Sequence, residues 1–348
     1  MISMTTAALM LMTLCSPAAR ADERADASSR SVGVAAPRQG YGFTGGTPIL
    51  ALNDEALSRQ LDAVVAAGSR WLRMPINWVV AEPHRGERDW SRMDRVVRAA
   101  RARGLTVLGV LGSTPDWARS SGTPASPPDD PRDFRRFAKA AARHFKQDVR
   151  HWEVWNEPNH SSFFDGTVEE YAELLKLAHR AITRVQHRAT IVVGGLARSS
   201  LGQSSAPADF VEELYAAGAR GHFDGVGAHP YLNAATAIFD EDRVWGEVED
   251  ARKVMRRNGD RKLKIWITEI GWSTWIGGWT QDRAADQALS LLQRAHDLRW
   301  VGMVVMYTIQ DRGTNPLQVH ENYGALLTAD GSPKELFVRL SDGATASE

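Results

Sequence analysis

One octapeptide carries the strongest structural signal in this sequence: Trp152-Glu153-Val154-Trp155-Asn156-Glu157-Pro158-Asn159. Its first residues are mostly apolar and typical of a buried β-strand, and the proline ends the strand because it has no backbone N–H. The strand therefore presents the amide of Asn156 beside the carboxyl of Glu157 at its carboxyl end. Glutamate is rarely buried without a partner, so a functional role is favoured over a plain core strand followed by a turn.

A second apolar run also ends in a carboxylate: Lys264-Ile265-Trp266-Ile267-Thr268-Glu269-Ile270-Gly271-Trp272. Taken alone, Glu269 could also be a strand-end carboxylate that pairs with a structural arginine. Two carboxylates delivered by two strand ends are, however, the groups that cleave a glycosidic bond. We therefore predict a site built around Glu157 and Glu269.

Short apolar runs alternate with amphipathic stretches from residue 40 onward. Strands are expected over residues 40–43, 71–75, 106–111, 150–156, 191–194, 225–229, 265–269 and 303–308. Helices are expected over residues 54–67, 91–103, 131–145, 167–187, 206–217, 245–258 and 281–299, with a last one from Pro333. This alternation predicts an α/β fold, the (β/α)8 or TIM barrel.

The loops are asymmetric in a way that locates the site. Links from helix to strand are short, as at residues 68–70, whereas links from strand to helix are long, as at 113–130, 158–166, 230–243, 271–280 and 310–332. In such barrels the catalytic face is the one built from the strand-to-helix loops. Glu157 and Glu269 would both enter that face, from the fourth and the seventh strand.

Composition favours an uncharged partner. Lys plus Arg and Asp plus Glu both number 42 in 348 residues, so no net field attracts nucleic acid or an anionic membrane. We expect an oligo- or polysaccharide substrate, no nucleic acid, no membrane span and a monomer.

The N-terminus resembles a secretory signal. Residues 1–21 hold an apolar run over 7–15 and the small-residue site Ala19-Arg20-Ala21, with cleavage expected before Asp22. Residues 22–38 are expected to be a disordered linker, and 39–342 the catalytic domain. Secreted, periplasmic or cell-envelope localisation is the corresponding expectation. Cys15, the only cysteine, lies in the signal, so the mature chain would have no disulfide.

The Asn-Glu-Pro after strand four and the Glu at the end of strand seven resemble clan A of the retaining glycoside hydrolases, over roughly residues 41–340. The motifs Trp-Asn-Glu-Pro-Asn and Thr-Glu-Ile-Gly-Trp are most similar to those of family 39 and the neighbouring family 5 type bacterial enzymes. The resemblance implies that Glu157 is the general acid/base, Glu269 the nucleophile and Asn156 a donor to the sugar 2-hydroxyl. It also implies a two-glutamate double displacement on an extracellular or cell-envelope polysaccharide, with β-linked sugars.

Four further positions follow from the same resemblance. Arg73 stands near the end of strand two, where the clan carries an arginine that orients the nucleophile; a plain barrel-mouth salt bridge is the alternative. His229 and Tyr231 close strand six, where a sugar-contacting His and a Tyr that reaches the nucleophile are expected, although a strand-end His can also be an ordinary core residue. Tyr307 stands where many members place a Trp beneath the reacting sugar.

Sugar faces pack on aromatic rings, so tryptophans on the strand-to-helix loops are candidate contacts. Those on or beside these loops are Trp78, Trp117, Trp272, Trp275 and Trp279. We select Trp117 and Trp272 as substrate contacts, with packing against the residue's own loop as the open alternative.

Other functions are weighed against this one. A catalytically silent, polysaccharide-binding barrel would often have lost one of the two glutamates, and both are present. A metal-dependent hydrolase would need clustered ligands such as His-x-His, and the 10 histidines form no such pair. We therefore expect no metal and no cofactor. Transglycosylation instead of hydrolysis, and exo or endo action, stay open.

Overall fold

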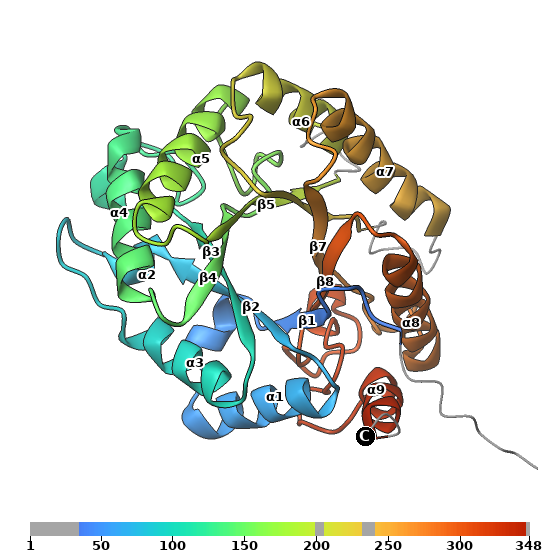
Figure 1. Cartoon of the computed structure of the whole chain (residues 1–348). Helices are drawn as coiled ribbons and strands as arrows, with labels where there is room; N and C mark the ends of the chain where they lie inside the picture. Colours follow the sequence, from blue (N-terminus) through green and yellow to red (C-terminus); the bar gives the residue numbers. More distant parts are fainter. Residues whose placement is uncertain (1–34, 199–204, 232–240, 346–348) are drawn as a thin grey trace, which may run out of the picture. The chain divides into compact units, whose positions relative to one another are not determined.

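The computed structural model describes residues 35–198, 205–231 and 241–345. In this part of the chain, parallel strands form a closed barrel in sequence order, with β1 pairing back onto β8 (Figure 1). The strands are β1 (Tyr41–Thr44), β2 (Trp71–Asn77), β3 (Thr106–Gly112), β4 (Val149–Val154), β5 (Thr190–Ala197), β6 (Gly225–His229), β7 (Lys264–Ile270) and β8 (Val301–Tyr307). The predicted (β/α)8 barrel is confirmed. The expected signal segment, and the linker up to residue 34, lie outside the described residues.

Helices surround the barrel on its outside (Figure 1). They are α1 (Asp54–Ala66), α3 (Ser91–Ala102), α4 (Pro131–His144), α5 (Val168–Thr183), α6 (Pro207–Ala216), α7 (Glu241–Arg257), α8 (Gln281–Asp297) and α9 (Glu335–Thr345). Each expected helix is present, with ends shifted by a few residues. The sequence pattern did not predict the single-turn α2 (Trp78–Ala81) or the short 3-10 helices η1 (Thr47–Ala51), η2 (Asp116–Ala118) and η3 (Val319–Glu321).

Side chains inside the barrel form an aromatic layer with a charged layer above it. Residues two apart on a strand share a face, so Trp71 and Arg73 on β2, and His151 and Glu153 on β4, point the same way. Strands β2 and β4 are not neighbours, yet Trp71 and His151 lie 4.8 Å apart between ring centroids, and Arg73 pairs with Glu153. These side chains therefore meet across the barrel interior. The charged layer lies nearer the carboxyl ends of the strands.

Among the described residues, none of the helices combines the length and the apolar character that crossing a bilayer requires.

Candidate active site

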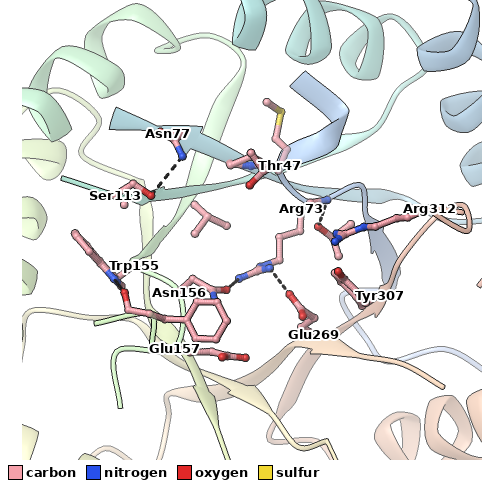
Figure 2. A pocket seen from close by; sticks show the side chains of 17 residues that line it. Thr47, Arg73, Asn77, Ser113, Trp155, Asn156, Glu157, Glu269, Tyr307 and Arg312 are labelled. Carbon is pink, nitrogen blue, oxygen red and sulfur yellow. Dashed lines mark hydrogen bonds and ion pairs between the residues drawn. The ribbon is translucent and has the colours of Figure 1, made fainter. Parts of the chain in front are cut away.

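A cavity of about 410 Å³ opens at the carboxyl ends of the strands (Figure 2). Its walls come from β1, β2, β3, β7 and β8 and from the turn after β4. Arg73, Asn156, Glu157, Glu269 and Tyr307 all line it. The face predicted from loop lengths is therefore the one that carries the cavity, and both glutamates reach it.

The two carboxyl groups are close. One carboxylate oxygen of Glu157, one of Glu269 and one ring nitrogen of His229 all lie within 4.8 Å of one another. Retaining glycosidases hold their carboxyls about 5–5.5 Å apart, whereas inverting ones leave about 6.5–9.5 Å for a water. Three such groups can also hold a metal ion, but the guanidinium of Arg73 already lies 2.8 Å from Glu269. A second cation there would be repelled, so the arrangement suits carboxylate chemistry better.

The backbone after β4 turns sharply to deliver these groups. Trp155 has φ 71° and Glu157 has φ 47°, the left-handed region that non-glycine residues seldom adopt. The Trp155 indole Nε1–H donates to the carbonyl of Phe163 at 2.7 Å, which holds the turn. A Cβ at Gly194 would lie 2.6 Å from the Trp155 carbonyl oxygen, so only glycine on β5 leaves room for this turn.

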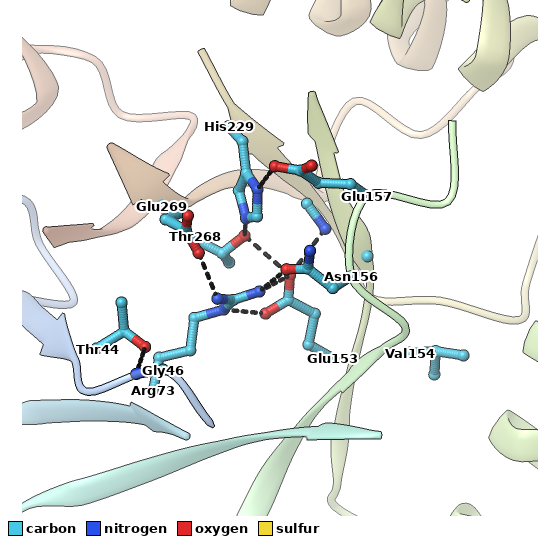
Figure 3. A network of polar contacts seen from close by, with 12 residues as sticks. Thr44, Gly46, Arg73, Glu153, Val154, Asn156, Glu157, His229, Thr268 and Glu269 are labelled. Atoms are coloured by element: carbon cyan, nitrogen blue, oxygen red, sulfur yellow. Dashed lines mark hydrogen bonds and ion pairs between the residues drawn. The ribbon is translucent and has the colours of Figure 1, made fainter. Parts of the chain in front are cut away.

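Arg73 is the centre of the polar network (Figure 3). Its Nε and Nη2 donate to Glu153 at 2.7 and 3.2 Å, its Nη1 to Glu269 Oε2 at 2.8 Å, and its Nη2 also to Asn156 Oδ1 at 2.8 Å. Burial lowers the pKa of Arg73, but the carboxylates of Glu153 and Glu269 more than reverse this, so its net pKa lies above the ordinary value. The expected contact with Glu269 is present, and Arg73 stays charged.

Glu153 and Thr268 belong to this network, and the sequence reasoning missed both. Glu153 is fully buried and accepts hydrogen bonds from Arg73, from the Gly195 amide at 2.7 Å and from the Thr268 hydroxyl at 2.9 Å. A signal was available, because Glu153 is a charged residue inside an otherwise apolar strand and must have partners. Its partners could not be read, since they come from other strands.

His229 lies behind Glu157 rather than in the cavity wall. It is fully buried, with Nδ1 2.8 Å from Glu157 Oε1 and Nε2 3.1 Å from Thr268 Oγ1. The expected role as a sugar contact does not match this placement. The residue contacts a carboxyl group instead, because β6 directs its side chain to the interior beside β7.

Two tyrosines lie near Glu269. The Tyr231 hydroxyl donates to Glu269 Oε1 at 3.0 Å, as expected. Burial raises the pKa of Tyr231 well above its ordinary value, and the negative charge of Glu269 raises it further, so the hydroxyl remains a donor. Tyr307 lines the cavity, and the Arg312 guanidinium carbon lies 5.0 Å from the centroid of its ring.

The two selected tryptophans do not line the cavity. Trp117 donates its Nε1–H to the Glu82 carbonyl at 2.7 Å and packs edge-on against Trp78, with centroids 5.4 Å apart. Trp272 is buried in the core cluster. Two aromatic residues of the segment after β4 do line the cavity, namely Trp155, which is buried, and Phe163, which is 44% exposed. Position on a loop does not reveal whether a ring turns to the cavity or to the core.

A model of glycosyl hydrolase family 10 matches residues 51–342. The chain belongs to this family. A curated β-xylosidase of Caldicellulosiruptor saccharolyticus is 41% identical to it over 78 residues, which are 20% of this chain and 16% of that protein. The chain thus spans only part of the length of the relatives it matches, and its family membership agrees with the clan A glycoside hydrolase expected from its motifs.

Solved structures share its fold. A family 39 glycoside hydrolase of Bacteroides cellulosilyticus WH2 superposes with a TM-score of 0.71 at 24% identity, covering 90% of this chain and 64% of that one. A monomeric β-xylosidase of Caulobacter crescentus CB15 gives 0.66 at 20%, covering 88% and 69%. A GH5_18 enzyme of Streptomyces cattleya in complex with GlcNAc gives 0.65 at 17%, covering 88% and 80%. Families 39 and 5, which the sequence motifs led us to expect, therefore appear among the structural neighbours. The family model that matches the chain is, however, that of family 10.

Proposed function

We propose that Glu269 is the nucleophile and Glu157 the general acid/base of a double displacement on a glycan. The observation that carries this is the approach of their carboxylate oxygens to within 4.8 Å across one cavity. At that separation Glu269 can attack the anomeric carbon directly while Glu157 reaches the leaving oxygen.

In the first step, a Glu269 oxygen bonds to the anomeric carbon while the bond to the leaving oxygen breaks. Glu157 gives its proton to that oxygen. Arg73 at 2.8 Å and Tyr231 at 3.0 Å donate to different oxygens of Glu269, so the nucleophile is held in its ionised form and in a fixed orientation. Both donors also stabilise the carboxylate when it leaves again.

In the second step, water attacks the same carbon from the face of the departed group. Glu157, now a carboxylate, takes the proton of that water, and the ester bond to Glu269 breaks. Two inversions give retention of configuration. A sugar hydroxyl that replaces water would give transglycosylation with the same groups.

Asn156 supplies a donor beside the reacting carbon. Because Asn156 Oδ1 accepts from Arg73, its amide nitrogen is left as the group directed away from the guanidinium. No described residue accepts a hydrogen bond from this nitrogen, although Asn156 lines the cavity. It can therefore donate to the 2-hydroxyl of a bound sugar, a bond that strengthens in the transition state.

The substrate we propose is a β-linked oligo- or polysaccharide of the extracellular space or the cell envelope, with the protein exported to reach it. The short match to a β-xylosidase supports a β-linked sugar, and the signal-like residues 1–21 support export. The resident side chains complete the chemistry described above, so we propose no cofactor, and we propose that the protein acts as a monomer.

The decisive experiment offers plant, fungal and bacterial-envelope polysaccharides to residues 22–348, with Glu269→Gln as the matched control. Products are separated by size, and the anomeric form released first is read by NMR. Sugar released by the wild type alone, in the β-configuration, supports the proposal. Release of the opposite anomer would refute the double displacement, and binding without cleavage would indicate a silent polysaccharide-binding barrel.

A further inference from the structure

A buried chain of hydrogen bonds runs from Glu153 through Thr268 and His229 to Glu157 (Figure 3). We propose that Glu153 and Thr268 are positioning residues that fix His229 with its proton on Nε2, so that Nδ1 retains the acidic proton of Glu157 in the resting enzyme. This inference rests on the proposed role of Glu157 as general acid. It follows from counting the protons that each group can hold.

The count begins at Glu153, which must be ionised. Its four contacts are Arg73 Nε at 2.7 Å, Arg73 Nη2 at 3.2 Å, the Gly195 amide at 2.7 Å and the Thr268 hydroxyl at 2.9 Å. The first three can only donate. A proton on the carboxyl would find no acceptor among these three donors, would cancel the charge that pairs with Arg73, and could not be donated to water because the group is fully buried.

Thr268 has one hydroxyl proton and two polar neighbours. If it donated to His229 Nε2, its oxygen lone pairs would face the Glu153 carboxylate at 2.9 Å without a proton between them. The hydroxyl therefore donates to Glu153, as a charge-assisted bond. Its oxygen is then an acceptor for Nε2 at 3.1 Å, and His229 must carry a proton on Nε2.

With Nε2 protonated, Nδ1 of a neutral His229 carries no proton, and its lone pair points at Glu157 Oε1, 2.8 Å away. Two lone pairs at that distance repel, so one proton must lie between these atoms. The opposite tautomer would instead donate from Nδ1 to an ionised Glu157, and the acid would be lost. Thr268 thus decides whether Glu157 is protonated before substrate binds.

The imidazole ring of His229 packs closely against β5, which restricts its movement. A Cβ at Gly195 would lie 2.0 Å from His229 Nε2 and 2.6 Å from Thr268 Oγ1, so the glycine lets the ring pack directly against β5. The same residue's amide donates to Glu153. Gly195 therefore contacts three members of the hydrogen-bond chain, namely Glu153, Thr268 and His229.

During the reaction the proton leaves and returns. The leaving-group oxygen replaces Nδ1 as its acceptor, which needs only a turn about the soft terminal torsion of Glu157. After the transfer, an ionised Glu157 faces the Nδ1 lone pair, and the pair is one proton short. The water that attacks the glycosyl ester supplies that proton as the bond to Glu269 breaks, which restores the resting state.

Thr268→Val removes the hydroxyl with little change of shape, and Thr268→Ser keeps it. The probes are 2,4-dinitrophenyl and phenyl β-D-xylosides and β-D-glucosides. The dinitrophenyl group leaves without a proton, so the Val variant should cleave these glycosides at nearly the wild-type rate while kcat/KM for phenyl glycosides falls about 10- to 100-fold. Ser should restore the phenyl activity. If kcat/KM falls equally for the dinitrophenyl and the phenyl glycosides, or falls for neither, the inference is overturned.

A second measurement does not need turnover. In histidine-labelled protein, nitrogen NMR distinguishes the two tautomers, and the His229 signals are those that vanish in His229→Gln. We expect a protonated Nε2 in the wild type and in Thr268→Ser, and a shift to Nδ1–H in Thr268→Val. A wild-type Nε2 without a proton contradicts the inference even if Glu157 is the acid. Full activity of Glu157→Ala on every substrate would refute the proposed function while leaving the tautomer result intact.

Discussion

Arg73 and Glu153 form a buried ion pair across the barrel, with Arg73 Nε 2.7 Å from Glu153 Oε2 and side chains 5% and 0% exposed. The pair joins β2 to β4 beneath the cavity and leaves Arg73 Nη1 directed at Glu269. The arginine that orients the proposed nucleophile is thus held by a carboxylate that is buried and does not line the cavity. Fold stability and site geometry depend on the same contact.

Removing the charge of Glu153 should destabilise the fold. Glu153→Gln leaves the buried Arg73 with one carboxylate fewer, and breaking such pairs costs about 3–5 kcal/mol of unfolding free energy. Urea unfolding measures this. The control is Glu55→Gln, which removes an exposed partner of Arg59 and should cost less than about 1 kcal/mol. Equal losses of unfolding free energy in the two variants would mean that the buried pair stabilises the fold no more than an exposed one.

Removing the proposed nucleophile should abolish turnover. Glu269→Ala opens a space beside the anomeric carbon, and azide can enter it as an external nucleophile. Activity on dinitrophenyl glycosides should then return with azide, giving the glycosyl azide of inverted configuration. Retained activity without azide would show that another group attacks.

Glu157→Ala should separate substrates by leaving group. Hydrolysis of phenyl glycosides or of a polysaccharide should fall about 10²- to 10⁴-fold, the usual contribution of general acid catalysis. Glycosyl-enzyme formation from dinitrophenyl glycosides should persist and appear as a burst. If both classes of substrate lose the first step equally, Glu157 has a different role.

Tyr231→Phe should lower kcat about 10- to 100-fold with little effect on KM, because one charge-assisted hydrogen bond to Glu269 is lost. Burial raises the pKa of Tyr231 well above its ordinary value, so the hydroxyl keeps its proton as the pH rises. The alkaline limb of the pH–rate profile should consequently be the same in wild type and variant. A limb that moves in Tyr231→Phe would show that the tyrosine titrates.

His151 should make the fold sensitive to acid. Burial lowers its pKa to about 4, helped by the charge of Arg150, whereas the unfolded chain titrates near 6.5. Between these values the unfolded state binds the extra proton, so stability is full above about pH 6.5 and falls as the pH drops towards 4. The loss is about 3 kcal/mol at most. His151→Leu should unfold with a smaller loss over this range; an identical pH dependence would exclude His151 as its source.

The sequence alone determined the barrel and the position of the two glutamates. Alternating apolar and amphipathic segments set the order of strands and helices, and a parallel barrel places every strand's carboxyl end on one face. Glu157 and Glu269 therefore had to meet on that face. A local pattern also gave Asn156, which lies at the end of a recognisable strand, whereas Tyr231 was expected because of the resemblance to clan A.

Apart from the contacts of Arg73 and Tyr231 with Glu269, which the resemblance implied, only the tertiary structure decided what those residues touch. Arg73, Glu153, Thr268 and His229 come from β2, β4, β7 and β6, and their contacts form only when the barrel closes. The same holds for Trp117, which contacts Trp78 and Glu82 in the segment after β2, and for Phe163, which lines the cavity. Strand periodicity fixes which face a side chain takes, but the partner across the interior depends on register and closure, which no local stretch of sequence encodes.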